Sequence, residues 1–184
     1  ADLEKGNCQI VNLGSASSLD DIQTTGTGMS IGMWVKNNQY TNSQPMLIGK
    51  GNANYNGYWH LFLDNNDPSI RFMKDFSGSS DLSVRADYPN TYLGQFKHIV
   101  LTWDGSSSAS NVHFYIDGLE VSKISSVDGD GSAVSDAALN VSMGLSVIDS
   151  TLPFNGLMDE IRIYNRVLSA DEVADLYQTG QMKI

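Results

Sequence analysis

The sequence predicts an all-β fold in which two antiparallel sheets stack as a β-sandwich, followed by one short C-terminal helix. The first observation is compositional. The chain has 17 Asp and 17 Gly against 4 Glu and 7 Lys, which is typical of strands joined by tight turns. The second is that short apolar segments recur between clusters of Asp, Asn, Gly and Ser, without long helical segments between them. The third is length, because 184 residues suit one domain spanning residues 1–184.

Alternation of side chains predicts which face of each strand is buried. In segment 58–64, Trp59, Leu61 and Leu63 share the face assigned to the core, together with Trp34 and one face of 97–103. The other core positions are Ile70, Phe72, Val112, Phe114 and Ile116. The expected strands are 9–13, 29–36, 46–50, 58–64, 69–74, 97–103, 112–117, 120–124, 139–143 and a last one that includes Leu157, Ile161 and Ile163.

The opposite faces of these strands mix aromatic rings with imidazole and guanidinium groups. Flat rings can stack on the C–H side of a pyranose, and forked donors can satisfy its hydroxyl groups. Loops rich in Asn and Tyr offer similar groups at the sandwich ends, so a ligand fits either a sheet face or the loop end. For each residue the alternative is that it only covers the sandwich. The candidate ligand-binding residues are Tyr40, Asn54, Tyr55, Tyr58, His60, Phe62, Arg71 and Tyr115.

The C-terminal segment 153–173 has a distinctive order of elements. A Phe-Asn-Gly turn leads into a strand that carries Asp159 and Glu160, and a helix then begins at Ser169 with the spacing of a capping box. Four upstream segments precede it: 6–14, 30–36, 94–105 and 114–118. Together, and in this order, they resemble the laminin-G-like and concanavalin-A-like jelly-roll domains over essentially the whole chain. The resemblance implies a jelly roll that binds ligands, mostly sugars.

The same resemblance implies a structural calcium ion where the first strand meets the last. Asp159 and main-chain carbonyls near Gly6 would hold it, since calcium prefers hard oxygen ligands. Where the family usually carries Asp before this glycine, the chain has Lys5. The alternative is that Asp159 and Glu160 satisfy local backbone donors. A second acidic stretch, 128–132 with Asp136, lacks an acidic twelfth position and is expected to be a plain hairpin loop.

Charge and composition exclude several classes of partner. A net charge of −10 disfavours nucleic acid or an anionic membrane surface and suits neutral or cationic ligands. Cys8 is alone, and no apolar stretch reaches 18 residues, so neither an internal disulfide nor a membrane span is expected. Residues 1–6 carry no signal-peptide pattern, as in a mature or excised domain. The three histidines, His60, His98 and His113, lack zinc-motif spacing, and His98 is expected to be structural.

Catalytic patterns are missing from the sequence. The four glutamates have none of the spacing found in the glucanases that share this type of fold, and no Gly-x-Ser-x-Gly elbow or phosphate-binding loop is present. We therefore expect a non-catalytic carbohydrate-binding module that recognises a polysaccharide or glycan. It would be secreted or extracellular, and tethered to a larger secreted, polysaccharide-active enzyme. The alternatives are an adhesion or protein-binding laminin-G-like domain and, less well supported, a glycan-degrading enzyme.

Overall fold

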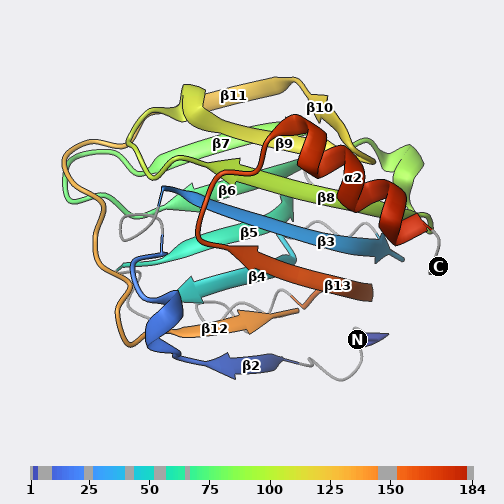
Figure 1. The fold of residues 1–184 in the computed structure, drawn as a ribbon, viewed down its shortest axis with the longest axis horizontal. Helices are drawn as coiled ribbons and strands as arrows, with labels where there is room; N and C mark the ends of the chain where they lie inside the picture. The colour runs from blue at the N-terminus through green and yellow to red at the C-terminus, as the bar shows by residue number, and fades with distance from the viewer. Residues whose placement is uncertain are drawn as a thin grey trace.

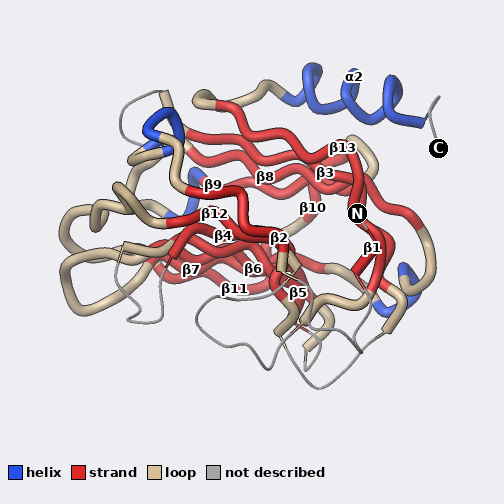
Figure 2. The backbone as a smooth tube through the Cα atoms, turned by 90° about the horizontal axis from the view of Figure 1, so that it is seen from below, coloured by secondary structure: helices blue, strands red, loops and turns tan. Residues whose placement is uncertain are grey.

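Two stacked sheets make up the body of the molecule. The computed structural model describes residues 2–3, 10–22, 27–39, 44–51, 57–64, 67–144 and 153–181. Within these residues the strands form one sheet of six and one of seven, with antiparallel pairing between neighbours (Figures 1 and 2). The predicted two-sheet β-sandwich is therefore confirmed. No helix among the described residues combines the length and apolar character that a membrane span requires.

The six-stranded sheet has the order β1-β13-β3-β8-β9-β10. Its middle strands β3 and β8 are long and pair over eight residues in unbroken register. The short strand β1 pairs with the last strand β13 in this sheet, whereas the expected first strand 9–13 corresponds to β2 and belongs to the other sheet. The strands are β1 (Asp2–Leu3), β3 (Met29–Asn37), β8 (Phe96–Trp103), β9 (Val112–Ile116), β10 (Leu119–Val121) and β13 (Gly156–Tyr164).

The seven-stranded sheet has the order β11-β7-β6-β5-β4-β12-β2. Strands β5, β6 and β7 lie side by side at its centre and pair without a register shift. Short 3-10 turns lie at Ser17–Leu19, Asn90–Tyr92 and Ala109–Asn111. The strands are β2 (Val11–Gly14), β4 (Met46–Gly51), β5 (Trp59–Asp64), β6 (Ser69–Lys74), β7 (Leu82–Asp87), β11 (Lys123–Val127) and β12 (Asn140–Met143).

The core lies between the sheets and is built from alternate residues, as the sequence predicted. Trp59 is 1% exposed, and Leu61 and Leu63 are completely buried. Phe72 and Trp103, from opposite sheets, meet with ring centres 5.4 Å apart. The other predicted core residues, confirmed as buried in the same cluster, are Ile70, Ile99, Leu101, Val112, Phe114 and Ile116.

Trp34 corrects one core prediction. Alternate β3 residues Met33 and Val35 face the core, so Trp34 between them points to the outer side of the sheet. There it lies 5.7 Å from the ring of Tyr177 and 5.2 Å from that of His98. The Trp34 side chain is buried because helix α2 covers it. It therefore packs against a helix and not against the opposite sheet.

Helix α2 (Ala170–Gln181) lies on the outside of the six-stranded sheet (Figure 2). Its capping box is present: the Ser169 backbone N–H donates to Glu172 Oε2 (2.9 Å), and the Glu172 N–H donates to Ser169 Oγ (3.2 Å). The predicted start is therefore confirmed, and the helix continues to Gln181. Val173 packs against Val100 and Tyr115 of the sheet. The helix thus closes one outer face of the sandwich.

Two strand predictions need correction. The expected single strand 120–124 is two strands, β10 and β11, which belong to different sheets. Ser122 separates them, and here the chain crosses from one sheet to the other. Strand β7 was not among the expected strands. Its inward residues Leu82, Val84 and Ala86 are completely buried, so the alternation of a strand is present there too.

Candidate functional site

The outer side of β5, β6 and β7 carries a dense group of polar and aromatic side chains. Register places Phe62 opposite Arg71, and Arg71 opposite Arg85. One pleat away, His60 lies opposite Met73. Because inward positions of these strands are filled by the core, these residues face away from it. We call this surface the β5–β7 face; its side chains are those of Tyr58, His60, Phe62, Asp64, Arg71, Met73, Ser83 and Arg85.

Glycines on β4 make room for the imidazole of His60. A Cβ atom at Gly49 would lie 2.5 Å from His60 Cδ2, and one at Gly51 would lie 3.1 Å from His60 Nε2. The ring also stacks on Tyr58, with centres 4.9 Å apart. His60 Nε2 is buried and has no hydrogen-bond partner among the described residues, and the same is true of Ser142 Oγ, two strands away in the same row. Two buried polar atoms are thus left unsatisfied on one row of the sheet.

The environment also fixes the charge states of these two rings. Burial lowers the pKa of His60 to about 4, so its imidazole is neutral at pH 7. The Tyr58 hydroxyl donates to Asp81 Oδ2 over 2.6 Å. Burial, followed by this hydrogen bond, raises the pKa of Tyr58 above its usual range. The pair therefore presents uncharged, stacked rings rather than an acid and a base.

Arg71 occupies the middle of the β5–β7 face. Its guanidinium carbon lies 5.7 Å from the centre of the Phe62 ring, within the range of a cation–π contact. Its Nε donates to Ser83 Oγ at 3.0 Å. Burial, then the charge of Arg85, lowers the pKa of Arg71, although a guanidinium remains protonated at neutral pH. The side chain is half-buried and held from two sides.

Arg85, the arginine on the next strand, is bound by the protein through its Nε and Nη2 nitrogens. Its Nη2 donates to Asp67 Oδ2 at 2.8 Å and to Ser69 Oγ at 3.1 Å. Asp64 Oδ2 lies 3.6 Å from the same nitrogen and also accepts from Gln44. This end of the face is therefore an internally neutralised network.

The structure brings together four of the predicted ligand-binding residues: Tyr58, His60, Phe62 and Arg71. Tyr58, His60 and Phe62 are only 6%, 8% and 6% exposed, and Arg71 is half-buried. Tyr115 is not with them. It lies on β9 of the other sheet, 7% exposed, and packs with Leu168 and Val173 beneath α2. Alternation had correctly pointed Tyr115 away from the core, but the helix covers it. The predicted residues Tyr40, Asn54, Tyr55 and Gly6 lie outside the described residues.

The predicted calcium residue Asp159 is exposed on β13. The Glu160 backbone N–H donates to Asp159 Oδ1 at 2.9 Å. Glu160 has a φ of 49° at a register shift in the strand, and its side chain pairs with Arg162. Among the described residues no group of three or more His, Cys, Asp or Glu could hold a metal. Asp159 thus offers one carboxylate, and the remaining ligands would have to come from around Gly6.

The acidic stretch 128–132 behaves as the loop that was expected. Asp128 Oδ1 accepts from the Ala109 backbone N–H at 2.7 Å, and Asp130 Oδ2 accepts from that of Ser79 at 2.9 Å. Each carboxylate therefore satisfies a backbone donor of a neighbouring segment.

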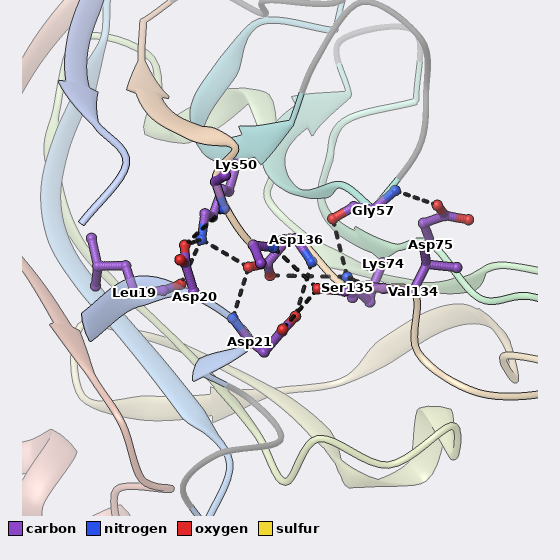
Figure 3. Close-up of polar contacts among 12 residues, drawn as sticks. Leu19, Asp20, Asp21, Lys50, Gly57, Lys74, Asp75, Val134, Ser135 and Asp136 are labelled. Atoms are coloured by element: carbon purple, nitrogen blue, oxygen red, sulfur yellow. Dashed lines mark hydrogen bonds and ion pairs between the residues drawn. The ribbon is translucent and has the colours of Figure 1, made fainter. Parts of the chain in front are cut away.

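Asp136 has a different role, because it lies completely buried between two buried lysines (Figure 3). Lys50 Nζ donates to Asp136 Oδ1 at 2.8 Å and to Asp20 Oδ1 at 2.6 Å. Lys74 Nζ lies 3.9 Å from Asp136 Oδ2 and donates to the carbonyl oxygen of Val134. We call Lys50, Lys74, Asp136 and Asp20 the buried charge cluster. It joins β4 and β6 to two loops, and so fixes the strands on either side of β5.

A second feature lies beside the helix on the other sheet. An open cavity of about 410 Å³ is found there. Lys97 at its wall pairs with Asp117 at 2.8 Å and lies 4.3 Å from the ring centre of Tyr92. The residues that line the cavity are Trp34, Phe96, Lys97, Asp117, Tyr177 and Gln181.

Sequence reasoning missed three residues of the candidate site. Ser83 and Arg85 were missed with strand β7, and the alternation of residues 82–86 was the signal that could have found them. Gly49 was read only as a strand residue. Its role depends on the ring that lies over it, which no local pattern encodes.

Comparison with known proteins agrees with the two-sheet fold. The family model of the concanavalin A-like lectin/glucanases superfamily matches residues 12–174. The chain is also similar to the adhesion G-protein coupled receptor V1 of Danio rerio, with 24% identity over 152 residues. That match covers 80% of this chain and only 2% of the receptor.

Two solved structures show the same fold. One is the botulinum neurotoxin serotype G binding domain, with a TM-score of 0.71 and 18% identity, covering 97% of this chain and 42% of that one. The other is domain 4 of a GH43 extracellular arabinanase from Geobacillus stearothermophilus in complex with arabinotriose. It has a TM-score of 0.58 and 22% identity, covering 94% of this chain and 74% of that one. With the family match over most of its length, this chain belongs to the concanavalin A-like lectin/glucanases superfamily.

Proposed function

We propose that this domain is a non-catalytic carbohydrate-binding module whose ligand lies on the β5–β7 face. The observation that carries the proposal is the unsatisfied His60 Nε2, buried beside the Tyr58 ring and over a glycine strand. A buried polar atom without a partner destabilises the folded protein, so its retention points to a partner that arrives with a ligand. A sugar hydroxyl is a suitable partner, and the adjacent rings suit the apolar side of a pyranose.

Binding without catalysis fits the carboxylates of this face. Retaining glycosidases need two carboxylates about 5 Å apart, one of them free to attack. On the β5–β7 face the described carboxylates are already engaged, since Asp64 contacts Arg85 and Gln44 while Asp81 accepts from Tyr58. The arabinanase domain, solved with arabinotriose, is a relative of the kind that this proposal expects.

A glycan array and affinity gels of soluble polysaccharides test the proposal. Single sites of this type bind with free energies of about −4 to −8 kcal/mol, or millimolar to micromolar dissociation constants. We expect retention that free sugar competes away. His60→Ala should weaken it about tenfold or more, whereas His113→Ala should not, because His113 lies on the other sheet, paired with Glu120. Equal retention of both variants would remove the β5–β7 face as the site.

The proposal extends to the location of the domain. We expect it outside the cell, tethered to a larger protein that acts on polysaccharides, as in the extracellular arabinanase. Immunodetection of the native protein in the medium, as a species larger than this chain, is the expected result. Detection only inside cells would contradict it.

Calcium beside Asp159 also remains a proposal. The strand pairing of β1 with β13 brings the start of the chain to this region, and Asp159 is exposed there. A bound ion stabilises the folded state in proportion to its saturation, so chelation should lower the melting temperature. An unchanged melting temperature at low free calcium would remove the ion from the proposal.

A protein-binding function is the second candidate. The adhesion receptor match and the open cavity beside α2 favour it. It predicts no retention on any glycan, together with capture of a defined protein partner that Lys97→Glu weakens. Competition of binding by free sugar would decide against it.

A further inference from the structure

Arg71 differs from the other arginines of the chain in that no described residue forms an ion pair with it. The sequence contains four arginines. Arg85 pairs with Asp67, Arg162 with Glu160, and Arg166 with Glu172. Among the residues described, none places a carboxylate within ion-pair distance of Arg71, although acidic residues outnumber basic ones by 21 to 11. In so acidic a protein, this exception is informative.

The surroundings of Arg71 increase the cost of leaving it unpaired. The side chain is half-buried, and its cross-strand neighbour is a second cation, Arg85. Like charges directly opposite each other destabilise a sheet. Burial lowers the pKa of Arg71 and the charge of Asp64 acts in the opposite direction, but the Asp64 carboxylate lies in contact with Arg85 and Gln44. The sheet therefore keeps a half-buried cation at its centre without a direct ion pair to any described residue.

The contacts that fix the position of Arg71 leave the two Nη groups of its guanidinium available. Nε is used by Ser83 Oγ, and the ring of Phe62 lies 5.7 Å from the guanidinium carbon. These two contacts restrict the side chain. The Nη donors make no hydrogen bond to any described residue, and they form the part of the group that binds a carboxylate or sulfate through two parallel hydrogen bonds.

We propose that the β5–β7 face recognises an acidic polysaccharide, and that Arg71 binds an oxyanion carried on the sugar ring. The proposal rests on the carbohydrate-binding function above and names its ligand class. The Tyr58 and His60 rings, both uncharged, would contact the sugar body, while Arg71 would take the carboxylate of a uronic acid or a sulfate ester. Phe62 and Ser83 would hold the guanidinium in place.

The charge of the whole molecule makes this inference specific to one residue. A net charge of −10 repels polyanions, so retention of an acidic glycan would not come from general attraction. The sequence alone favoured neutral or cationic ligands for that reason. A half-buried local cation that has no ion pair with a described residue can reverse the preference at one point of the surface.

Paired polysaccharides provide the test without any mutation. Polygalacturonate is compared with its methyl-esterified form, in which the carboxylates are blocked, and dextran sulfate with dextran. Binding is measured by affinity electrophoresis and titration calorimetry. We expect at least one acidic member to bind about ten- to a hundredfold more tightly than its neutral counterpart, the range typical of a charge-assisted hydrogen bond. The two pairs distinguish carboxylate from sulfate.

Matched variants then assign the effect to Arg71. Arg71→Gln should abolish the preference for the acidic member, while Arg162→Gln, with the same charge change on the other sheet, should preserve it. Arg71→Lys should retain only part of the preference, because an ammonium group cannot form two parallel hydrogen bonds to one oxyanion. Equal binding of acidic and neutral members, or an undiminished preference in Arg71→Gln, would overturn this inference while leaving carbohydrate binding intact. No retention on any glycan would instead overturn the proposed function.

Discussion

Asp136 is the counterion of two completely buried lysines, and its replacement by Asn gives a quantitative test of the buried charge cluster. The change keeps the size and the Oδ1 acceptor, and removes only the charge. Asp136 Oδ1 lies 2.8 Å from Lys50 Nζ, and Oδ2 lies 3.9 Å from Lys74 Nζ. Removing one partner of a buried pair costs about 3–5 kcal/mol. We expect the lower end, about 3 kcal/mol, because Asp20 still neutralises Lys50.

The matched control is Asp20→Asn, because Asp20 contacts the same ammonium but is 26% exposed in its side chain. Solvent screens this pair, so its loss should cost about 1 kcal/mol or less. Urea unfolding at low temperature, followed by tryptophan fluorescence and far-ultraviolet circular dichroism, measures both variants. Midpoints that fall by the same small amount would refute the idea that Asp136 compensates two buried charges.

The pH dependence of the Asp136→Asn variant gives an independent check. Burial lowers the pKa of Lys74 below its ordinary 10.5, opposed by the charge of Asp136. Between the lowered folded pKa and 10.5, the unfolded state binds more protons, so stability rises with pH in this window. Without Asp136 the folded pKa falls further. The gap between the variant and the wild type should therefore narrow as the pH rises towards 10.5, and a constant gap would contradict the mechanism.

Three further predictions concern acid stability, the helix and the glycine strand. Burial lowers the pKa of both His60 and His98 to about 4, so the unfolded state binds more protons between pH 6.5 and about 4. Stability should fall as the pH drops through this window, by about 3 kcal/mol per histidine, and His98→Leu should remove about half of the loss in urea titrations at each pH. Ser169→Ala removes the helix cap and should cost about 1 kcal/mol in urea unfolding; a change below about 0.3 kcal/mol would show that α2 does not depend on it. Gly49→Ala places a Cβ atom 2.5 Å from His60 Cδ2 and should cost about 1–3 kcal/mol and weaken glycan retention. Gly32→Ala, with 3.6 Å to its nearest neighbour, is the control, and equal effects would contradict a special role for Gly49.

The sequence predicted the fold well because the long strands have one mainly apolar face. Trp59, Leu61 and Leu63 on β5 alternate with polar or aromatic neighbours and are buried as expected. The capping box at Ser169 likewise needs only local spacing, and it is present. Signals that depend on two or three neighbouring residues could thus be read directly from the chain.

The errors arose where tertiary contacts, rather than local pattern, decide burial. Trp34 is buried on the outer side of its sheet because α2, far along the chain, covers it. Tyr115 is covered in the same way by Val173. At Ser122 the chain changes sheets, so one predicted strand became two. A large apolar side chain alone does not tell whether a sheet or a helix will cover it.

The candidate site could be predicted in its residue types but not in its charge balance. Alternation placed Tyr58, His60, Phe62 and Arg71 on outward faces. Strands β5, β6 and β7 follow one another in the sequence and are also neighbours in the sheet. Among the described residues Asp64 and Asp67 pair with Arg85 rather than with Arg71, and this pairing depends on strand β7, which was not foreseen.

The cations on the two sides of the seven-stranded sheet differ in their ion pairing, and this contrast supports the proposed ligand site. On the inner side Lys50 and Lys74 are fully buried, and Asp136 with Asp20 neutralises them. On the outer side, on the same strand as Lys74, Arg71 has no carboxylate within ion-pair distance among the described residues. The chain has carboxylates in excess. This contrast supports the proposal that an acidic ligand from outside the chain supplies the counter-charge at Arg71.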